Sequence, residues 1–298
     1  MVISVVIPTR NRESWLKKCL AAMLAQNITA PFEIIVVNDG STDGTREFLD
    51  SLRDERVRVV HHDARRGKSA ARNSGIRTAH GEIIAFTDDD MAVDKSWLTE
   101  LARMFSTDNV VGVFGATHYV GDAKKHYFPE RVVANPHARF PMGGNIAYRR
   151  QVFDRVGFFD SHFDSFANED TEFALRALRV GHLVANSNAI ATHAQSTWTA
   201  KTLIKSAKNA SVWPLLMKRY PHELRNARFH TPMIGRVVYP KDYLALLFSP
   251  FLIPIMLLRF FLHGKRNIFL FFVKWPVLLI VRRVMIWREA WREKIFVV

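Results

Sequence analysis

Strand-length apolar runs alternate with helix-like patterns along the first 115 residues. Short, mostly β-branched runs that predict strands cover residues 2–7, 32–37, 57–61 and 83–86. Apolar positions at helical spacing predict helices between and after them, over residues 15–24, 48–52, 69–79 and 97–105. Strands of this kind are covered on both faces, and their alternation with helices is typical of parallel sheets. The pattern therefore predicts an α/β fold with a mostly parallel sheet between two layers of helices.

Residues 110–200 follow a less regular pattern. Residues 110–114 predict a strand and residues 151–156 a short helix. A stronger helix is predicted over residues 170–180, and Gly181 ends it. Two further strands are predicted over residues 182–185 and 189–192.

The composition changes near residue 200. Residues 201–228 have the pattern of basic amphipathic helices. Two apolar segments follow: 243–258, which contains no charged residue but two prolines, and 268–281, in which Lys274 is the only charged residue. We therefore expect an α/β domain over residues 1–200, a basic helical connector over 201–240 and a hydrophobic, basic region over 241–298.

The charge of the chain is concentrated in its last third. The formal net charge is +14, from 42 Lys and Arg and 28 Asp and Glu. Residues 1–200 hold 24 basic and 24 acidic residues, whereas residues 201–298 hold 18 basic and 4 acidic ones. A hydrophobic content of 48% excludes a disordered chain. The single Cys19 excludes an internal disulfide and, with no signal peptide visible at the start, indicates that the N-terminal part works in the cytoplasm.

Polar side chains follow three of the predicted strands. The runs are Thr9-Arg10-Asn11-Arg12, Asn38-Asp39-Gly40-Ser41 and Thr87-Asp88-Asp89-Asp90. Ligands of open α/β sheets bind beyond the carboxyl ends of the strands. One aspartate at a strand end is most often a turn or helix cap, but three polar strand ends in one sheet indicate a shared site.

The three consecutive aspartates after the fourth strand carry the clearest chemistry. Asp88, Asp89 and Asp90 repel one another in a partly dry site, so a cation or hydrogen-bond donors must compensate them. Hard carboxylate oxygens suit Mg²⁺ or Mn²⁺, which leave coordination positions for phosphate oxygens. The alternative interpretation is a solvated acidic loop.

Phosphate-binding glycine loops are missing from the sequence. No Gly-x-Gly-x-x-Gly follows the first strand and no Gly-x-x-x-x-Gly-Lys-Ser/Thr occurs, which disfavours a dinucleotide-binding dehydrogenase or a P-loop enzyme. Side-chain cations would then neutralise a phosphate. The candidates are Arg65, Arg66, Lys68 and Arg72, which otherwise form a solvated basic loop.

Glu169 and Asp170 open the helix that Gly181 ends. Acids at a helix N-terminus are favoured by the helix dipole alone, but one of these carboxylates could equally act as a general base. His193 follows the last predicted strand of this part, where a neutral imidazole would be a suitable additional metal ligand or a merely structural side chain.

These motifs together resemble those of family 2 glycosyltransferases. The resemblance rests on residues 5–12, 36–43, 71–75 (Ala-Arg-Asn-Ser-Gly) and 88–90, and on Gly143-Gly144-Asn145-Ile146-Ala147-Tyr148-Arg149 and Glu169-Asp170-Thr171-Glu172. It covers roughly residues 1–200, in order and at family-like spacing. It implies a GT-A fold, which is Rossmann-like, and an inverting, metal-dependent transfer of a sugar from a nucleotide-diphosphate donor to a hydroxyl group.

The resemblance also implies roles for individual residues. Asp170 matches the general base, and Asp88, Asp90 and His193 match the contacts of a Mg²⁺ or Mn²⁺ ion. Thr9, Arg10, Asp39, Arg72, Asp88 and Asp89 would bind the nucleotide-sugar, with Asp39 near the base and Asp89 in a variable position. Gly143, Gly144, Asn145 and Glu169 would line the sugar and acceptor pocket.

The C-terminal region predicts a membrane partner. Both apolar segments are marginal for crossing a bilayer, which takes about 20 apolar residues, and basic residues flank their ends. We favour helices that lie in the cytoplasmic leaflet with their cations on anionic headgroups. Two crossing helices, or a soluble apolar subdomain or oligomer interface, are the alternatives. The expected location is the cytoplasmic face of the membrane, with a lipid-linked or cell-envelope glycan as acceptor.

Two other classes of protein remain as alternatives. A sugar nucleotidyltransferase shares strand-end carboxylates and a metal, but its glycine-rich loop is missing. The sequence pI near 10.1 would also fit a non-enzymatic protein that binds nucleic acid or membranes. Because the basic residues flank apolar segments, we expect lipid and not nucleic acid to be their partner.

Overall fold

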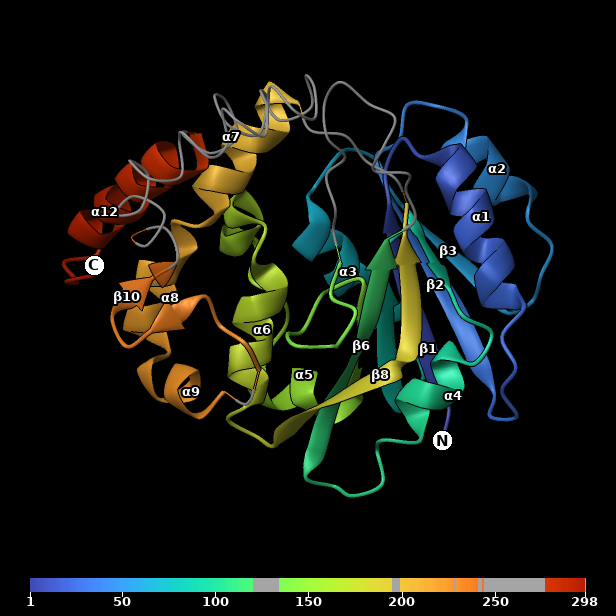
Figure 1. Cartoon of the computed structure of the whole chain (residues 1–298). Helices are drawn as coiled ribbons and strands as arrows, with labels where there is room; N and C mark the ends of the chain where they lie inside the picture. Colours follow the sequence, from blue (N-terminus) through green and yellow to red (C-terminus); the bar gives the residue numbers. More distant parts are fainter. Residues whose placement is uncertain (120–133, 195–198, 228, 241–242, 244–276, 298) are drawn as a thin grey trace, which may run out of the picture. The chain divides into compact units, whose positions relative to one another are not determined.

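The computed structural model describes residues 1–119, 134–194, 199–227, 229–240, 243 and 277–297. The chain forms two compact units (Figure 1). The N-terminal unit comprises Met1–Val120, Val133–Ala194 and Asn226–Phe229, and the C-terminal unit comprises Gly121–Val132, Gln195–Arg225 and His230–Val298. The predicted boundaries at residues 200 and 240 stay a prediction.

The N-terminal unit is built on one eight-stranded sheet. Its strands are β1 (Ile3–Thr9), β2 (Phe32–Asp39), β3 (Val57–His62), β4 (Ile83–Thr87), β5 (Met91–Val93), β6 (Val110–Tyr119), β7 (Asn145–Arg149) and β8 (His182–His193), in the order β3-β2-β1-β4-β7-β6-β8-β5. The first four strands are parallel, as predicted. The strand β7 runs antiparallel to β4 and β6, and β5 runs antiparallel to β8. The predicted mostly parallel sheet is therefore corrected to a mixed one, because the apolar pattern of a strand is the same in either direction.

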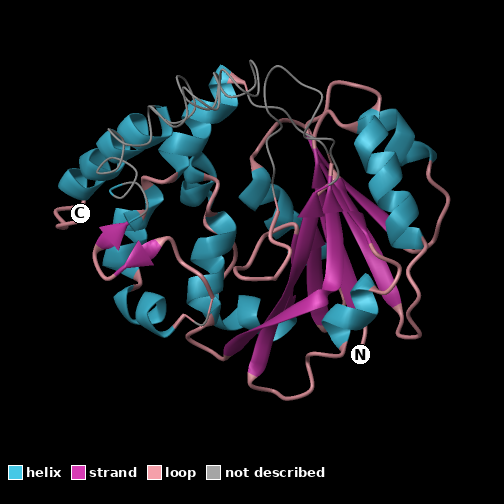
Figure 2. Ribbon diagram, in the orientation of Figure 1, coloured by secondary structure: helices cyan, strands magenta, loops and turns pink. Residues whose placement is uncertain are grey.

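Helices cover both faces of this sheet (Figure 2). One face presents Ile3, Val5 and Ile7 to α1 (Glu13–Leu24) and α4 (Trp97–Ala102), and all three side chains are buried. Each fully buried side chain of this size stabilises the fold by about 1.5–3 kcal/mol. The smaller helix α2 (Thr45–Ser51) lies beside β3.

The opposite face of the sheet is covered by α3 (Lys68–Thr78), α5 (Arg150–Val156) and α6 (Glu169–Ala177) (Figure 1). Phe173 of α6 packs against Tyr148, Phe153 and Phe159, with ring centroids 4.6–4.9 Å apart. Such aromatic contacts contribute about 0.5–1.5 kcal/mol each beyond the area that they bury. This cluster fixes α6 against the sheet and so sets the position of its first two residues, Glu169 and Asp170.

The strand β8 is longer than predicted. It runs unbroken from His182 to His193, where the sequence predicted two short strands. The polar residues between them stay in the strand through a register shift against β6 at Gly115/Ala116. Asn186 in this stretch donates its amide to the backbone carbonyl of Glu100, which satisfies the polar side chain.

The C-terminal unit is mainly helical in the part that the structure describes. Its elements are α7 (Ala200–Asn209), α8 (Val212–Arg219), α9 (Pro221–Asn226), the short strands β9 (Met233–Ile234) and β10 (Val237–Val238), a π-helical turn η3 (Val277–Val281) and α12 (Arg282–Arg292). The helix α12 packs on α7 and α8. The predicted helices over residues 201–228 are confirmed by α7, α8 and α9.

The two apolar segments of the sequence lie mostly outside the described residues. Of segments 243–258 and 268–281, only Tyr243 and Val277–Val281 are described. Among the helices that the structure does describe, none combines the length and apolar character needed to cross a bilayer. The expected membrane association therefore stays a prediction.

Candidate active site

The carboxyl ends of the first four strands bring the predicted polar residues to one edge of the sheet. The strand register pairs Thr9 with Asn38 and Asp39 with His62, and Asp88 directly follows β4. This convergence confirms that the strand ends meet, since parallel neighbours end on the same side.

Asp39 organises the loop that follows β3. Its carboxylate accepts hydrogen bonds from His62 Nδ1 (2.8 Å) and from the backbone N–H groups of Arg66 (2.7 Å) and Gly67 (2.9 Å). Burial alone would raise the pKa of Asp39, but these hydrogen bonds outweigh burial and hold the pKa below its ordinary value. Asp39 is therefore an ionised anchor for the segment that leads into α3.

Asp89 lies beneath the surface between β1 and the other two aspartates. It accepts a hydrogen bond from the Thr9 hydroxyl (2.7 Å) and from Arg12 Nη1 (2.9 Å). Burial raises the pKa of Asp89 to about 6, against the lowering effect of Arg12 and Thr9. Arg12 also pairs with Asp90. Asp89 thus holds Thr9 and Arg12 in place, and Arg12 neutralises two of the three aspartates.

Arg72 is a fully buried cation between two carboxylates. Its side chain is 0% exposed, and its Nη1 and Nη2 lie 2.9 Å from Glu169 Oε1 and 3.3 Å from Asp88 Oδ1. Lys68 Nζ lies 3.0 Å from Asp88 Oδ2. Burial alone would raise the pKa of Asp88, but Lys68 and Arg72 hold that pKa well below its ordinary value. Arg72 therefore connects the start of α6 to the aspartate cluster.

Asp170 faces the glycine pair before β7. Its Oδ2 accepts the backbone N–H of Gly143 (2.8 Å), and its Oδ1 accepts that of Thr171 (2.7 Å). A Cβ atom at Gly143 would collide with the Arg72 guanidinium, and one at Gly144 would lie 3.0 Å from Asp88 Oδ2. Burial and the neighbouring Glu169 carboxylate raise the pKa of Asp170, which Arg72 and the Gly143 N–H only partly oppose. The two glycines thus let the Arg72 guanidinium and the Asp88 carboxylate approach the backbone beside Asp170.

Asp88, Asp90 and His193 offer a suitable donor set for a divalent cation. His193 Nδ1 donates to the backbone carbonyl of Ala194 (2.7 Å), which leaves Nε2 as the lone-pair nitrogen, 3.8 Å from Asp90 Oδ1. Two carboxylates and one imidazole suit Mn²⁺ or Mg²⁺. Within the described part of the chain, no three His, Cys, Asp or Glu side chains are already arranged around a common point. Arg12 and Lys68 pair with the two carboxylates in the present arrangement.

Other predicted residues have different surroundings. The Asn145 side chain is buried and engaged with Trp97 Nε1 and the carbonyls of Ala116 and Ala189, so it holds β7 in the sheet. Arg10 is exposed at the end of β1. Their predicted roles in ligand binding stay predictions.

Three residues of this edge have no predicted role of their own. Arg12 belongs to a polar run after the first predicted strand, His62 follows the third, and Asp164 belongs to none of the motifs. Asp164 accepts hydrogen bonds from the N–H and hydroxyl of Ser69 at the start of α3. The doubled His61-His62 at a strand end was the one local signal available, because Asp164 lies 95 positions from its partner.

Related proteins match this chain in sequence. Chondroitin synthase of Escherichia coli is 28% identical over 75% of this chain and 39% of its own length. The uncharacterized glycosyltransferase EpsJ of Bacillus subtilis (strain 168) is 32% identical over 60% of this chain and 56% of its own length. The matches thus span about two-fifths to just over half of these two relatives.

Solved structures share the fold. The mannosyltransferase PcManGT from Pyrobaculum calidifontis, in complex with GDP-Man and Mn²⁺, superposes with a TM-score of 0.64 at 18% identity, over 96% of this chain and 86% of its own. Residues 1–349 of TarS from S. aureus, in complex with UDP-GlcNAc, give a TM-score of 0.59 at 17% identity, over 99% and 93%. The GT-A fold with a mixed central sheet is thereby shown.

A family model covers more than half of the chain. The model described as Glycosyl transferase family 2 matches residues 4–170, a range that includes Thr9, Asp39, the three aspartates, the glycine pair and Asp170. The chain therefore belongs to glycosyl transferase family 2.

Proposed function

We propose that this protein transfers a sugar from a nucleotide-diphosphate donor to an acceptor hydroxyl with inversion at the anomeric carbon. Asp170 takes the acceptor proton as the acceptor oxygen forms its bond to the anomeric carbon. The bond from that carbon to the diphosphate oxygen breaks on the opposite face, and the diphosphate leaves with the electron pair. Attack and departure on opposite faces produce the inversion.

The observation that carries this proposal is the glycine pair that Asp170 and Asp88 flank. The Gly143 N–H contacts Asp170, and Gly144 lies beside the Asp88 carboxylate, so the proposed base and the aspartate cluster flank the same two side-chain-free residues. Because neither position has a Cβ, the Arg72 guanidinium and the Asp88 carboxylate approach the backbone next to Asp170. A raised pKa makes the ionised Asp170 a stronger base than an exposed aspartate.

The cations of the site suit a diphosphate leaving group. Arg12 and Lys68 lie beside the aspartates with partly exposed side chains, so both can turn to phosphate oxygens. A bound Mn²⁺ or Mg²⁺, held by Asp88, Asp90 and His193, would neutralise negative charge on the diphosphate. Thr9, Arg10 and Asp39 are proposed to lie along the nucleoside.

The names of the related proteins support a nucleotide-sugar donor and a glycan product. The structures cited above hold GDP-Man with Mn²⁺ and UDP-GlcNAc, and one relative is named chondroitin synthase. We propose a UDP- or GDP-linked sugar as donor and a lipid-linked or cell-envelope glycan as acceptor.

The test is a panel of nucleotide sugars with Mn²⁺ or Mg²⁺, scored by the nucleoside diphosphate released as the sugar is transferred to water or to simple glycan acceptors. Asp170→Asn is expected to lower turnover by about 10²–10⁴-fold, because general base catalysis contributes that much. Donor affinity, measured by calorimetry, should stay within about threefold, because the base contacts the acceptor and not the nucleotide. The matched control is Asp154→Asn, an exposed aspartate of α5, which should keep wild-type turnover.

The pH profile sharpens the same test. Turnover is expected to fall on the acid side with an apparent pKa above about 4, the ordinary value for aspartate, because burial and Glu169 raise the pKa of Asp170. Full turnover by Asp170→Asn would remove Asp170 as the base. Release of inorganic pyrophosphate in place of a nucleoside diphosphate would instead indicate nucleotidyl transfer.

A further inference from the structure

The helix α12 and the preceding turn η3 present one buried face and one exposed apolar face. Leu279, Arg283, Ile286 and Ala290, spaced at helical intervals, are buried. On an adjacent face, Ile280, Val284, Trp287 and Trp291 follow the same spacing and are 60%, 53%, 51% and 87% exposed. The buried face is explained by packing on α7 and α8, whereas the exposed face is an apolar stripe along the helix.

Exposed cations flank this stripe. Arg288, Arg292 and Lys294 are exposed, and the Arg292 side chain is 72% exposed. The two acids nearby are turned away from solvent: Glu293 pairs with Lys218 at 2.9 Å, and the Glu289 side chain is only 13% exposed. The surface beside the stripe is therefore positive.

Exposed tryptophans next to arginines are typical of helices that lie in a membrane interface. Indole rings prefer the headgroup level of a bilayer, and flanking cations bind anionic lipid. The region 201–298 adds 18 basic residues against 4 acidic ones, so its charge complements an anionic surface. We propose that the stripe formed by Ile280 of η3 and by Val284, Trp287 and Trp291 of α12 is a membrane-docking surface that binds bilayers containing anionic lipid.

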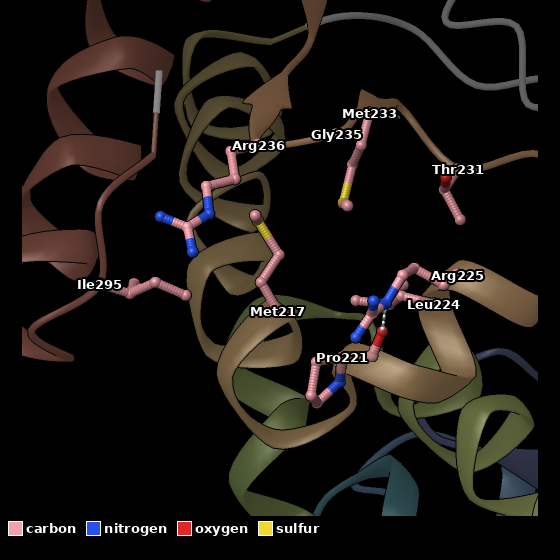
Figure 3. A pocket seen from close by; sticks show the side chains of 9 residues that line it. All are labelled: Met217, Pro221, Leu224, Arg225, Thr231, Met233, Gly235, Arg236 and Ile295. Atoms are coloured by element: carbon pink, nitrogen blue, oxygen red, sulfur yellow. Dashed lines mark hydrogen bonds between the residues drawn. The ribbon is translucent and has the colours of Figure 1, made fainter.

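A cavity in the same unit is likewise lined by apolar and basic side chains. It has a volume of about 480 Å³, and Ile295, three residues after α12, contributes to its lining (Figure 3). Met217, Leu224 and Met233 supply apolar atoms, and Arg225 and Arg236 supply two guanidinium groups. Both arginines are exposed. This mixture suits the phosphate and upper acyl chain of one anionic lipid.

The experiment is flotation of the full chain with vesicles of phosphatidylcholine alone or with about one-third phosphatidylglycerol. Wild-type protein is expected to float with the anionic vesicles. The double variant Trp287→Ser/Trp291→Ser should bind them at least about tenfold more weakly, because two indoles leave the interface. The matched control is Trp15→Ser, an exposed tryptophan of α1 in the N-terminal unit, which should bind as wild type does.

Charge reversal separates the electrostatic contribution to vesicle binding from the apolar one. Arg288→Glu/Arg292→Glu should weaken binding to the anionic vesicles and leave the small binding to neutral vesicles unchanged, and Arg225→Ser/Arg236→Ser should act in the same direction. Equal binding by wild type and the tryptophan double variant would overturn the proposal. So would a dimer in solution that the double variant dissociates, without vesicle binding, because the stripe would then face a second copy.

This inference does not depend on the proposed reaction. Nucleoside diphosphate release in lipid-free buffer, measured on the same variants, should equal that of wild type. If no donor is turned over but the flotation differences persist, the proposed reaction is wrong and the docking surface stands. If turnover is normal but the protein does not bind vesicles, the docking surface is wrong and the proposed reaction stands.

Discussion

Arg72 of the N-terminal unit has the opposite surroundings to Arg288 and Arg292 of the C-terminal unit. Arg72 in the N-terminal unit is fully buried, and its guanidinium lies between the carboxylates of Glu169 and Asp88. On α12, Arg288 and Arg292 are exposed, and the nearest carboxylate to Arg292 is 3.9 Å away on Glu289. The buried charges around Arg72 neutralise one another, whereas the exposed cations of α12 are available for the anionic surface that we propose.

The largest difference in stability is expected between the same substitution at Arg72 and at Arg288. Arg72→Met removes the buried cation that pairs with Glu169 and Asp88 and leaves them the exposed Lys68, so it should lower the free energy of unfolding by about 3–5 kcal/mol. Arg288→Met should change it by less than about 0.5 kcal/mol, because its side chain is solvated. Urea denaturation of the full chain measures both.

A second variant keeps this comparison testable if Arg72→Met does not fold. Arg72→Lys keeps the charge but loses the two-pronged geometry that reaches both carboxylates, so it should fold with an intermediate loss of stability. Equal effects at positions 72 and 288 would contradict the contrast between the two units.

Asp39 tests the internal pairing at the sheet edge. Asp39→Asn should cost about 1–3 kcal/mol of unfolding free energy at pH 7, because one carboxylate accepts three hydrogen bonds. The folded pKa lies below the unfolded value of about 4, so this stabilisation is fully present above pH 4 and is lost as the pH falls through the folded pKa. The difference between wild type and variant should therefore shrink on acidification. Asp63→Asn, an exposed neighbour, is the control and should differ little from wild type at either pH.

A substitution of Arg12 tests whether a metal ion can replace the arginine as the partner of the aspartates. Its guanidinium occupies Asp89 and Asp90, so Arg12→Ala should tighten binding of Mn²⁺ in the absence of donor by about fivefold, equivalent to about 1 kcal/mol. Titration followed by the paramagnetic signal of free Mn²⁺ measures this without turnover. Arg10→Ala, exposed on the same loop, should leave the affinity unchanged. Unchanged or weaker binding in Arg12→Ala would mean that Arg12 does not compete with the metal.

Much of the sheet edge could be predicted because its residues follow strands directly. Thr9, Asp39 and Asp88 each come at the end of an apolar run, and parallel strands end on one side. Glu169 and Asp170 were identifiable as the first residues of a helix. Their contacts with Arg72 and Gly143 were not, since no local pattern links positions 27 to 97 residues apart.

Short-range periodicity and composition predict the order of strands and helices, the four parallel strands with their polar ends, and the concentration of positive charge after residue 200. Tertiary packing sets the direction of β7 and β5, the enclosure of Arg72 between two carboxylates, and the exposure of Trp287 and Trp291 beside the buried Ile286. The same apolar pattern is compatible with a parallel or an antiparallel strand, and with a helix that buries either of its two faces. Packing against residues distant in the sequence therefore determines the strand direction and the buried face.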